Sequence, residues 1–211
     1  MTLVEDLKSA LYKGDADVAA ALTQRGLEEG MSAETLLSKG LIAGMDRVGV
    51  DFRSGVLFVP EVLIAARAMK AALEILRPLF AESGIEPVGR VVLGTVQGDL
   101  HDIGKNLVGM MLEGAGFEVH DLGVDVAPGK FVQAVREKKP DLVGLSALLT
   151  TTMTMMQTTI DALTEAGIRD QCRVIVGGAP LTEDFALGIG ADAYGADASL
   201  AVVRAKELLA M

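Results

Sequence analysis

The spacing of apolar side chains changes its period near residue 88 of the 211-residue chain. Before this point the period is helical, as in the repeat of Leu3, Leu7 and Leu11, and no strand-like alternation interrupts it. Breaks at KGDAD, EEGMS and FRSGVL separate four helical segments, and Ser32 is a suitable N-cap for the third. Four amphipathic helices of this length predict a small four-helix bundle.

Beyond the turn at residues 82–90, short apolar runs alternate with helical segments. The runs are RVVLGTV, FEVHDLG, DLVGLSALL, CRVIVGG and ADAYG, and helices are expected to begin at Lys105, Pro128, about Thr152, Thr182 and Ser199. Five strands that alternate with five helices predict a parallel sheet covered on both faces, a flavodoxin-like or Rossmann-like α/β fold. We therefore expect a helical domain at 1–87 and an α/β domain at 88–211.

Charge and composition exclude several classes of partner. The net charge is −10 and is negative in both predicted domains, which argues against nucleic acid and anionic membrane surfaces. No apolar run approaches the roughly 18 residues of a membrane-spanning helix, and the first residues lack the features of a signal peptide. The single cysteine, Cys172, excludes an internal disulfide, so we expect a protein of the reducing cytoplasm.

The polar groups of the predicted α/β domain gather where its strands end. These strand ends read QGDLHDIGKN, GVDVAPG, LSALLTTT, VGGAP and YGADAS. Because the carboxyl ends of parallel strands meet at one edge of the sheet, ligands are expected to bind there. Gly177 and Gly178 allow a ligand to approach the backbone closely because neither carries a Cβ atom. Ser146 and the threonines after it offer hydroxyl groups.

His101 lies in the first of these strand ends, between the carboxylates of Asp99 and Asp102. The loop is neither a phosphate loop nor a dinucleotide fingerprint, because the spacing of Gly98 and Gly104 fits neither pattern. A histidine beside a carboxylate that can hold its other ring nitrogen is the arrangement of a metal-ligating imidazole. No second histidine or cysteine lies nearby in the sequence, so the metal would have to arrive inside a macrocycle that supplies its equatorial ligands.

Three motifs and the helical region together resemble a known family. The segment DLHDIG at 99–104 matches the Asp-x-His-x-x-Gly signature of cobalamin-binding domains. The segment SAL at 146–148 matches the Ser-x-Leu that accompanies it, and the pair at 177–178 matches the third element. Residues 44–78 look like the helical cap of cobalamin-dependent methyltransferases such as methionine synthase. Over nearly its whole length, the chain is similar to the small corrinoid proteins of three-component methyltransferase systems.

This resemblance implies a bound cobalamin or related corrinoid whose lower base is displaced. His101 would be the lower axial ligand of cobalt, Asp99 would bond its other ring nitrogen, and Ser146 would extend that chain. The nucleotide tail would lie between the strand ends of Ser146 and of the glycine pair. The expected cofactor-binding residues of the α/β domain are Gly98, Asp99, Leu100, His101, Asp102, Ile103, Gly104, Ser146, Leu148, Thr150, Gly177, Gly178, Ala179, Tyr194, Gly195 and Ala196.

In the helical domain, the stripe of Phe58, Val62, Ala65 and Met69 would shield the upper face of the corrinoid. Ordinary core packing is the competing interpretation of such a stripe. The shielded face would have to open for partner proteins, and we expect the two domains to separate about the linker at 82–90.

The same resemblance implies a methyl carrier that cycles between cobalt(I) and methyl-cobalt(III), with methylcobalamin and hydroxocobalamin as the forms to isolate. Its expected partners are a substrate-specific methyltransferase, an acceptor methyltransferase acting on tetrahydrofolate or a thiol, and a reductive activase. The chain alone would be a carrier subunit and not a complete enzyme. No zinc-binding set can be assembled from its remaining histidine and cysteine to activate a methyl donor.

Two other functional classes stay open at this point. A cobalamin-based sensor or regulator would usually add a DNA-binding domain and would need an upper axial ligand from the helical part, where residues 1–87 contain no histidine. The cobalamin subunit of a carbon-skeleton mutase would lack the four-helix domain. An adenosyl form of the cofactor would indicate either of these, and a methyl or hydroxo form would indicate the carrier. A flavodoxin-like protein without a corrinoid is a more distant alternative.

Overall fold

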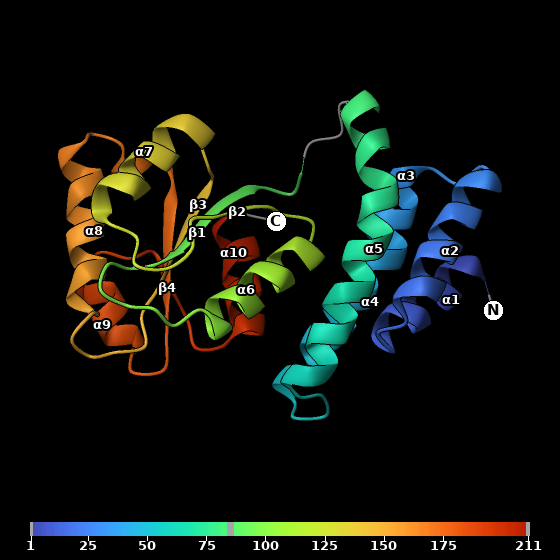
Figure 1. Cartoon of the computed structure of the whole chain (residues 1–211), viewed down its shortest axis with the longest axis horizontal. Coiled ribbons are helices and arrows are strands. Elements are labelled where there is room, and N and C mark those ends of the chain that lie inside the picture. Colours follow the sequence, from blue (N-terminus) through green and yellow to red (C-terminus); the bar gives the residue numbers. More distant parts are fainter. Residues whose placement is uncertain (1, 84–86, 210–211) are drawn as a thin grey trace. The chain divides into compact units, whose positions relative to one another are not determined.

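The computed structural model describes residues 2–83 and 87–209, which fall into two compact units. One unit comprises Met1–Pro87 with Glu113–Gly116, and the other comprises Val88–Leu112 with Phe117–Met211. In Figure 1 the chain runs from blue through the helices of the first unit to red at the end of the second. Among the described residues, no helix has both the length and the apolarity needed to cross a membrane.

Helices build the first unit, as the helical period predicted. Their bounds are α1 (Leu3–Tyr12), α2 (Ala16–Glu28), α3 (Ala33–Thr35), the π-helix η1 (Leu36–Ile42), α4 (Ala43–Arg53) and α5 (Val59–Ser83). The third predicted helix is thus one helical path from α3 through η1 into α4. Side-chain oxygens cap the starts of α1, α2 and α3: Thr2 accepts a hydrogen bond from the Glu5 N–H, Asp15 accepts one from the Val18 N–H, and Ser32, the predicted N-cap, accepts one from the Thr35 N–H.

The leucine repeat of α1 becomes part of the buried core of this unit, where Leu7 and Leu11 are fully buried. Two glycines of the η1–α4 path allow α1 to pack closely against it. A Cβ atom at Gly40 would lie 2.7 Å from the Cδ2 atom of Leu7, and one at Gly44 would lie 3.1 Å from the Cδ2 atom of Leu11. Larger residues at these two positions would force the helices apart.

The second unit is a five-stranded parallel sheet with strand order β2-β1-β3-β4-β5, which confirms the predicted fold class. The strands are β1 (Arg90–Thr95), β2 (Glu118–Asp121), β3 (Leu142–Ser146), β4 (Arg173–Gly177) and β5 (Ala193–Gly195). The helices between and after them are α6 (Ile103–Gly114), α7 (Pro128–Lys138), α8 (Thr154–Glu165), the 3₁₀ turn η2 (Arg169–Gln171), α9 (Glu183–Gly188) and α10 (Ala198–Leu208). Each predicted strand and helix is present, with starts shifted by a few residues.

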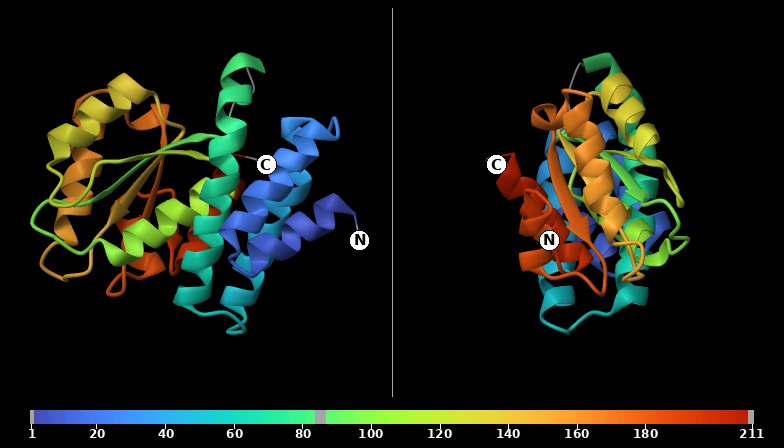
Figure 2. Two further views of the ribbon diagram at one scale, coloured as in Figure 1. Left: turned by 45° about the vertical axis from the view of Figure 1, so that its right-hand side comes forward. Right: turned by 90° about the vertical axis from the view of Figure 1, so that its left-hand side faces the viewer.

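Helices cover both faces of this sheet because alternate strand residues point to opposite sides. Val92 and Val143 pack with Phe131 of α7 and Met156 of α8 in one apolar core. The neighbouring strand residue Leu93 points to the other face, which α6 and α10 cover. Figure 2 shows α7 and α8, in yellow and orange, on one side of the strands and α10, in red, on the other.

The strand order determines where a ligand can bind at the carboxyl edge of the sheet. Strand β1 lies between β2 and β3, so the connections leave it in opposite directions and open a crevice at its carboxyl end. The last residues of four strands stand side by side in one row across the sheet: Thr95 pairs with Ser146, Ser146 with Gly177, and Gly177 with Gly195. Three segments expected at the binding edge are therefore adjacent in space.

Candidate cofactor-binding site

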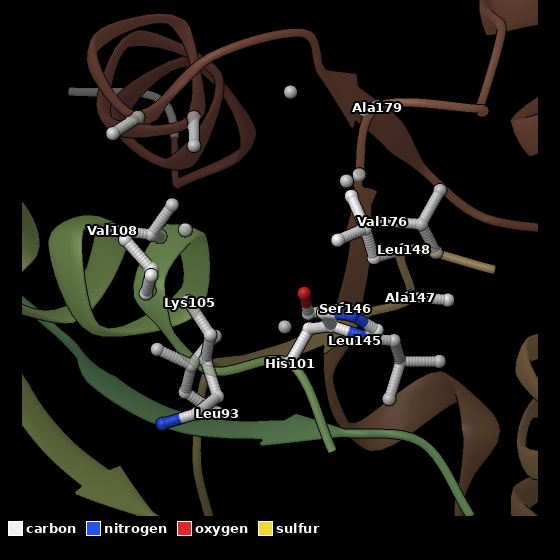
Figure 3. Close-up of a pocket in the computed structure, with 18 of the residues that line it drawn as sticks. Leu93, His101, Lys105, Val108, Leu145, Ser146, Ala147, Leu148, Val176 and Ala179 are labelled. Carbon is white, nitrogen blue, oxygen red and sulfur yellow. The ribbon is translucent and has the colours of Figure 1, made fainter. Parts of the chain in front are cut away.

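A cavity of about 460 Å³ opens at the carboxyl edge of the sheet, entirely within the α/β unit. Its walls come from the loop between β1 and α6, from the ends of β3, β4 and β5, and from α6 and α10. Figure 3 shows His101, Ser146 and Ala179 around this space. The predicted residues that line it are Leu100, His101, Asp102, Ile103, Gly104, Ser146, Leu148, Gly177, Gly178, Ala179, Gly195 and Ala196.

His101 and Asp99 form a hydrogen-bonded pair at the mouth of the cavity. The Nδ1 atom of His101 lies 2.6 Å from the Oδ1 atom of Asp99, which also accepts a hydrogen bond from the His101 backbone N–H at 3.1 Å. Asp99 is fully buried, whereas the His101 side chain is 49% exposed. An ionised carboxylate only accepts hydrogen bonds, so Nδ1 must carry the proton. The lone pair of Nε2 is then free to bind a metal.

The charge of Asp99 is stabilised by its neighbours. Its Oδ2 atom accepts hydrogen bonds from the Leu148 N–H at 2.8 Å, from the Leu149 N–H at 3.2 Å and from the Thr152 hydroxyl at 2.7 Å. Burial by itself would raise the pKa of this carboxyl group. The hydrogen bonds from Thr152, His101 and Leu148 outweigh burial and hold the pKa of Asp99 well below its usual range.

These residues fit a corrinoid. Among the described residues, no group of three or more histidine, cysteine, aspartate or glutamate side chains could hold a metal ion, whereas one imidazole can complete the coordination of a metal held by a macrocycle. Leu100 and Ile103, on either side of His101, are 72% and 79% exposed. Such apolar side chains suit the underside of a large planar ring, since burial there would remove their surface from water. The glycines of the cavity wall leave room for an extended ligand.

Comparison with known families agrees with this geometry. A model of the B12 binding domain matches residues 89–203, and a second B12 binding domain model matches residues 3–77. The chain belongs to the B12-binding family. The expected resemblance and the expected cofactor class, cobalamin or a related corrinoid, are thereby confirmed.

Individual relatives of this B12-binding chain match it over almost its full length. It is 44% identical over 209 residues to trimethylamine corrinoid protein 2 of Methanosarcina mazei, covering 98% of this chain and 96% of the relative. It is 46% identical over 209 residues to dimethylamine corrinoid protein 1 of Methanosarcina acetivorans, covering 99% and 98%.

Two solved structures match in both sequence and fold. A cobalamin-binding protein from Desulfitobacterium hafniense has a TM-score of 0.82 and 34% identity, with 99% of this chain and 98% of that one covered. The methanol:cobalamin methyltransferase complex MtaBC from Methanosarcina barkeri has a TM-score of 0.87 and 32% identity, with 99% and 80% covered.

One prediction about a hydrogen bond in the B12-binding domain is wrong. Ser146 was expected to extend the hydrogen-bond chain from Asp99, but Thr152 donates that hydrogen bond. Strand β3 ends at Ser146, whose hydroxyl is directed into the cavity in Figure 3. The chain then turns through Leu148 and Leu149, and this turn brings Thr152 onto the carboxylate. A threonine shortly before a helix was the available signal, but it was interpreted only as a helix start.

Sequence reasoning missed the deeper wall of the cavity. Leu93 of β1 and Val108 of α6 line it, and so does the stem of Lys105. The Lys105 side chain is only 1% exposed and forms an ion pair with Asp121 at the end of β2. Figure 3 shows its amine pointing away from the cavity. Helical spacing from Gly104 to Val108 could have placed this valine on the cavity side of α6.

Four expected residues of the α/β unit are not among the described lining residues. Asp99 acts through His101, and Gly98 forms a turn at a φ of 84° that favours glycine. Thr150 is exposed in the loop after β3, and the Tyr194 hydroxyl donates to the Leu181 carbonyl oxygen.

The four residues of the expected stripe in the helical unit differ in their exposure to solvent. Phe58 is 63% exposed, whereas Val62, Ala65 and Met69 are buried. The burial of these three residues agrees with the core-packing interpretation, and their shielding role stays a prediction.

Proposed function

We propose that this chain is a methyl-carrying corrinoid protein of a methyltransferase system. The observation that carries the proposal is the full-length similarity to trimethylamine and dimethylamine corrinoid proteins, together with the His101–Asp99 pair at the mouth of the cavity. The match of both units to these relatives favours a carrier over a mutase subunit without the helical unit, and the absence of histidine from residues 1–87 argues against a sensor that takes an upper axial ligand from that part. When bound, the corrinoid supplies a cobalt ion that accepts a methyl group from one partner and gives it to another.

In this proposal, His101 would hold the cobalt through Nε2. Asp99 keeps the proton on Nδ1 and fixes the direction of the ring, and its negative charge makes the imidazole a stronger electron donor. Because the low pKa of Asp99 keeps this carboxylate ionised, it remains a hydrogen-bond acceptor for the Nδ1–H group of His101. The half-exposed imidazole of His101 leaves Nε2 accessible to a ligand in the cavity.

The cavity behind His101 would hold the nucleotide tail of the corrinoid. The row of Ser146, Gly177 and Gly195 forms its floor, and the absence of side chains at the two glycines leaves space above the strand ends. Gly178, at a φ of 146°, passes so close to the Ala147 carbonyl oxygen that an added Cβ atom would overlap it. The turn after β4 can therefore follow this path only with glycine.

The domain boundary is part of the proposal. We propose that residues 1–87 form a cap domain for the corrinoid and that residues 88–211 form the cofactor domain. Motion about the linker at 82–90 would expose the cobalt to partners, although residues 84–86 of this linker lie outside the described residues.

The relatives suggest which donor partner to test first. A methyltransferase for a methylated amine is the first donor partner to test, since the trimethylamine and dimethylamine corrinoid proteins match so closely. The acceptor methyltransferase, for tetrahydrofolate or a thiol, and a reductive activase complete the proposed system. A reducing cytoplasm fits the single buried cysteine, Cys172.

The test uses the purified chain reconstituted with hydroxocobalamin and reduced to cobalt(I). Loss of the cobalt(I) absorbance after adding trimethylamine or dimethylamine should be slow with this chain alone and fast once the cognate methyltransferase is present. Failure of the chain to retain any corrinoid, or fast and saturable methylation without a partner, would contradict the proposal. An adenosyl corrinoid in protein purified from its native cells would favour the sensor or mutase alternative.

A further inference from the structure

The loop that carries His101 is held from two sides. It runs from Val96 to Asp102 after the central strand β1, between the loops that follow β2 and β3. On the β3 side, the Asp99 carboxylate accepts hydrogen bonds from Leu148, Leu149 and Thr152. These contacts belong to the metal-ligating arrangement already described, and they fix only one flank of the loop.

On the β2 side, Asp125 makes two hydrogen bonds to the same loop, and the next residue, Val126, pairs with Val96 at the start of the loop in a parallel β-bridge. The Asp125 carboxylate accepts a hydrogen bond from the Gly98 N–H at 2.7 Å, and the Asp125 N–H donates to the Asp99 carbonyl oxygen at 3.0 Å. Asp125 therefore holds the backbone of the loop on both sides of the peptide that joins Gly98 to Asp99.

Asp125 has an unusual backbone conformation. Its φ is 52°, and Asp125 and Lys139 are the two residues other than glycine with a positive φ in the described part of the chain. Aspartate is among the few side chains that tolerate this left-handed region. Because Asp125 is exposed, burial of its side chain does not explain the strained conformation. The two hydrogen bonds to the histidine loop do.

We propose that Asp125 is a positioning residue that clamps the 96–102 loop and so holds His101 in the direction needed for cobalt ligation. This inference rests on the proposed function only where it takes cobalt as the metal that His101 binds. The clamp itself is a property of this chain without cofactor. Thr95 also holds this loop, because its hydroxyl donates a hydrogen bond to the His101 carbonyl oxygen at 2.9 Å. Removing the Asp125 carboxylate would release the Gly98 side while leaving this bond and the Asp99 contacts in place.

Three variants separate positioning from general stability. Asp125→Ala removes the acceptor, and Asp125→Asn keeps a side-chain oxygen and the tolerance for a positive φ. Asp141→Ala is the matched control, because Asp141 also accepts one backbone hydrogen bond at 2.7 Å, from the Arg90 N–H, at the opposite end of the sheet. Thermal unfolding of each variant verifies that it is folded.

The first measurement is on the protein without cofactor. Amide hydrogen exchange at Gly98 should be roughly 10- to 100-fold faster in Asp125→Ala than in the wild type, because a hydrogen bond to a charged group is lost. Asp125→Asn should restore most of the protection, and Asp141→Ala should leave it unchanged. An unchanged exchange rate at Gly98 in folded Asp125→Ala overturns the clamp, whether or not the chain binds a corrinoid.

The second measurement is the electron paramagnetic resonance spectrum of the cobalt(II) holoprotein, in which nitrogen splitting reports histidine ligation. The histidine-ligated fraction should fall in Asp125→Ala and stay near the wild-type value in Asp125→Asn and Asp141→Ala. Equal losses in Asp125→Ala and Asp141→Ala, or no loss in folded Asp125→Ala, overturn the positioning role. A wild-type chain that binds no corrinoid overturns the proposed function instead, and the exchange measurement then decides the clamp.

Discussion

The Nδ1 atom of His101 lies 2.6 Å from the Oδ1 atom of Asp99, and the other oxygen of the same carboxylate is held by the loop after β3. The carboxylate thus connects the imidazole to a neighbouring strand end through one buried charge. This connection fixes which ring nitrogen is protonated and which one faces the cavity. The chemistry of the site therefore depends on two segments of the chain, the loop after β1 and the loop after β3.

Replacing His101 with alanine should remove histidine ligation. The variant should lose the nitrogen splitting in the cobalt(II) electron paramagnetic resonance spectrum and should release corrinoid more readily during gel filtration. His120→Ala is the control, because this second histidine lies on β2 beside Glu118 and outside the cavity wall. A His101→Ala spectrum that retains the nitrogen splitting would show that the ligand is another residue.

Replacing Asp99 with asparagine should lower stability in a pH-dependent way. The folded state lowers the pKa of Asp99, so its ionised form stabilises the fold above the unfolded-state pKa of about 4, and this contribution is lost as the pH falls toward the folded-state value. We expect Asp99→Asn to cost about 2 kcal/mol at pH 7. The difference from the wild type should shrink below about pH 5. Urea unfolding of the apoprotein across this range measures it, with Asp161→Asn on α8 as the control. A difference independent of pH would contradict the ionised state assigned to Asp99.

The hydroxyl of Thr152, rather than that of Ser146, should stabilise the charge of the Asp99 carboxylate. Thr152→Ala removes a buried hydrogen bond to a charged group and should cost about 2 kcal/mol in the free energy of unfolding of the apoprotein. Thr152→Ser keeps the hydroxyl and should recover most of this loss. Ser146→Ala should leave the stability nearly unchanged, because that hydroxyl faces the cavity. A larger loss in Ser146→Ala than in Thr152→Ala would reverse the assignment.

A larger side chain inside the cavity should exclude the nucleotide tail. Val108→Phe would fill the space between α6 and the strand ends, and it should weaken the binding of cobalamin by about tenfold or more. The binding of cobinamide, which lacks the nucleotide, should change little. Val203→Phe is the matched control, because Val203 is also a half-buried helical valine but is not among the lining residues. Equal weakening for both corrinoids would indicate that the tail does not enter this cavity.

The sequence by itself predicted the elements of both units and much of the cavity edge. The leucine repeat of α1 is visible because one face of a helix meets the core at a regular spacing, and the five strands are visible because each is a short apolar run. The segment from Leu100 to Gly104 was identifiable because its residues are consecutive. Local patterns of this kind require no knowledge of distant contacts.

Only the tertiary structure decided which distant groups meet. Thr152 bonds Asp99 across 53 positions, and Asp125 bonds Gly98 across 27. Both contacts depend on β1 lying between β2 and β3 and on the path of each loop after its strand. The period of the apolar residues encodes neither the strand order nor the loop path, because periodicity reports only which side of an element is buried. The residues that hold His101 in place were for this reason decided by the fold.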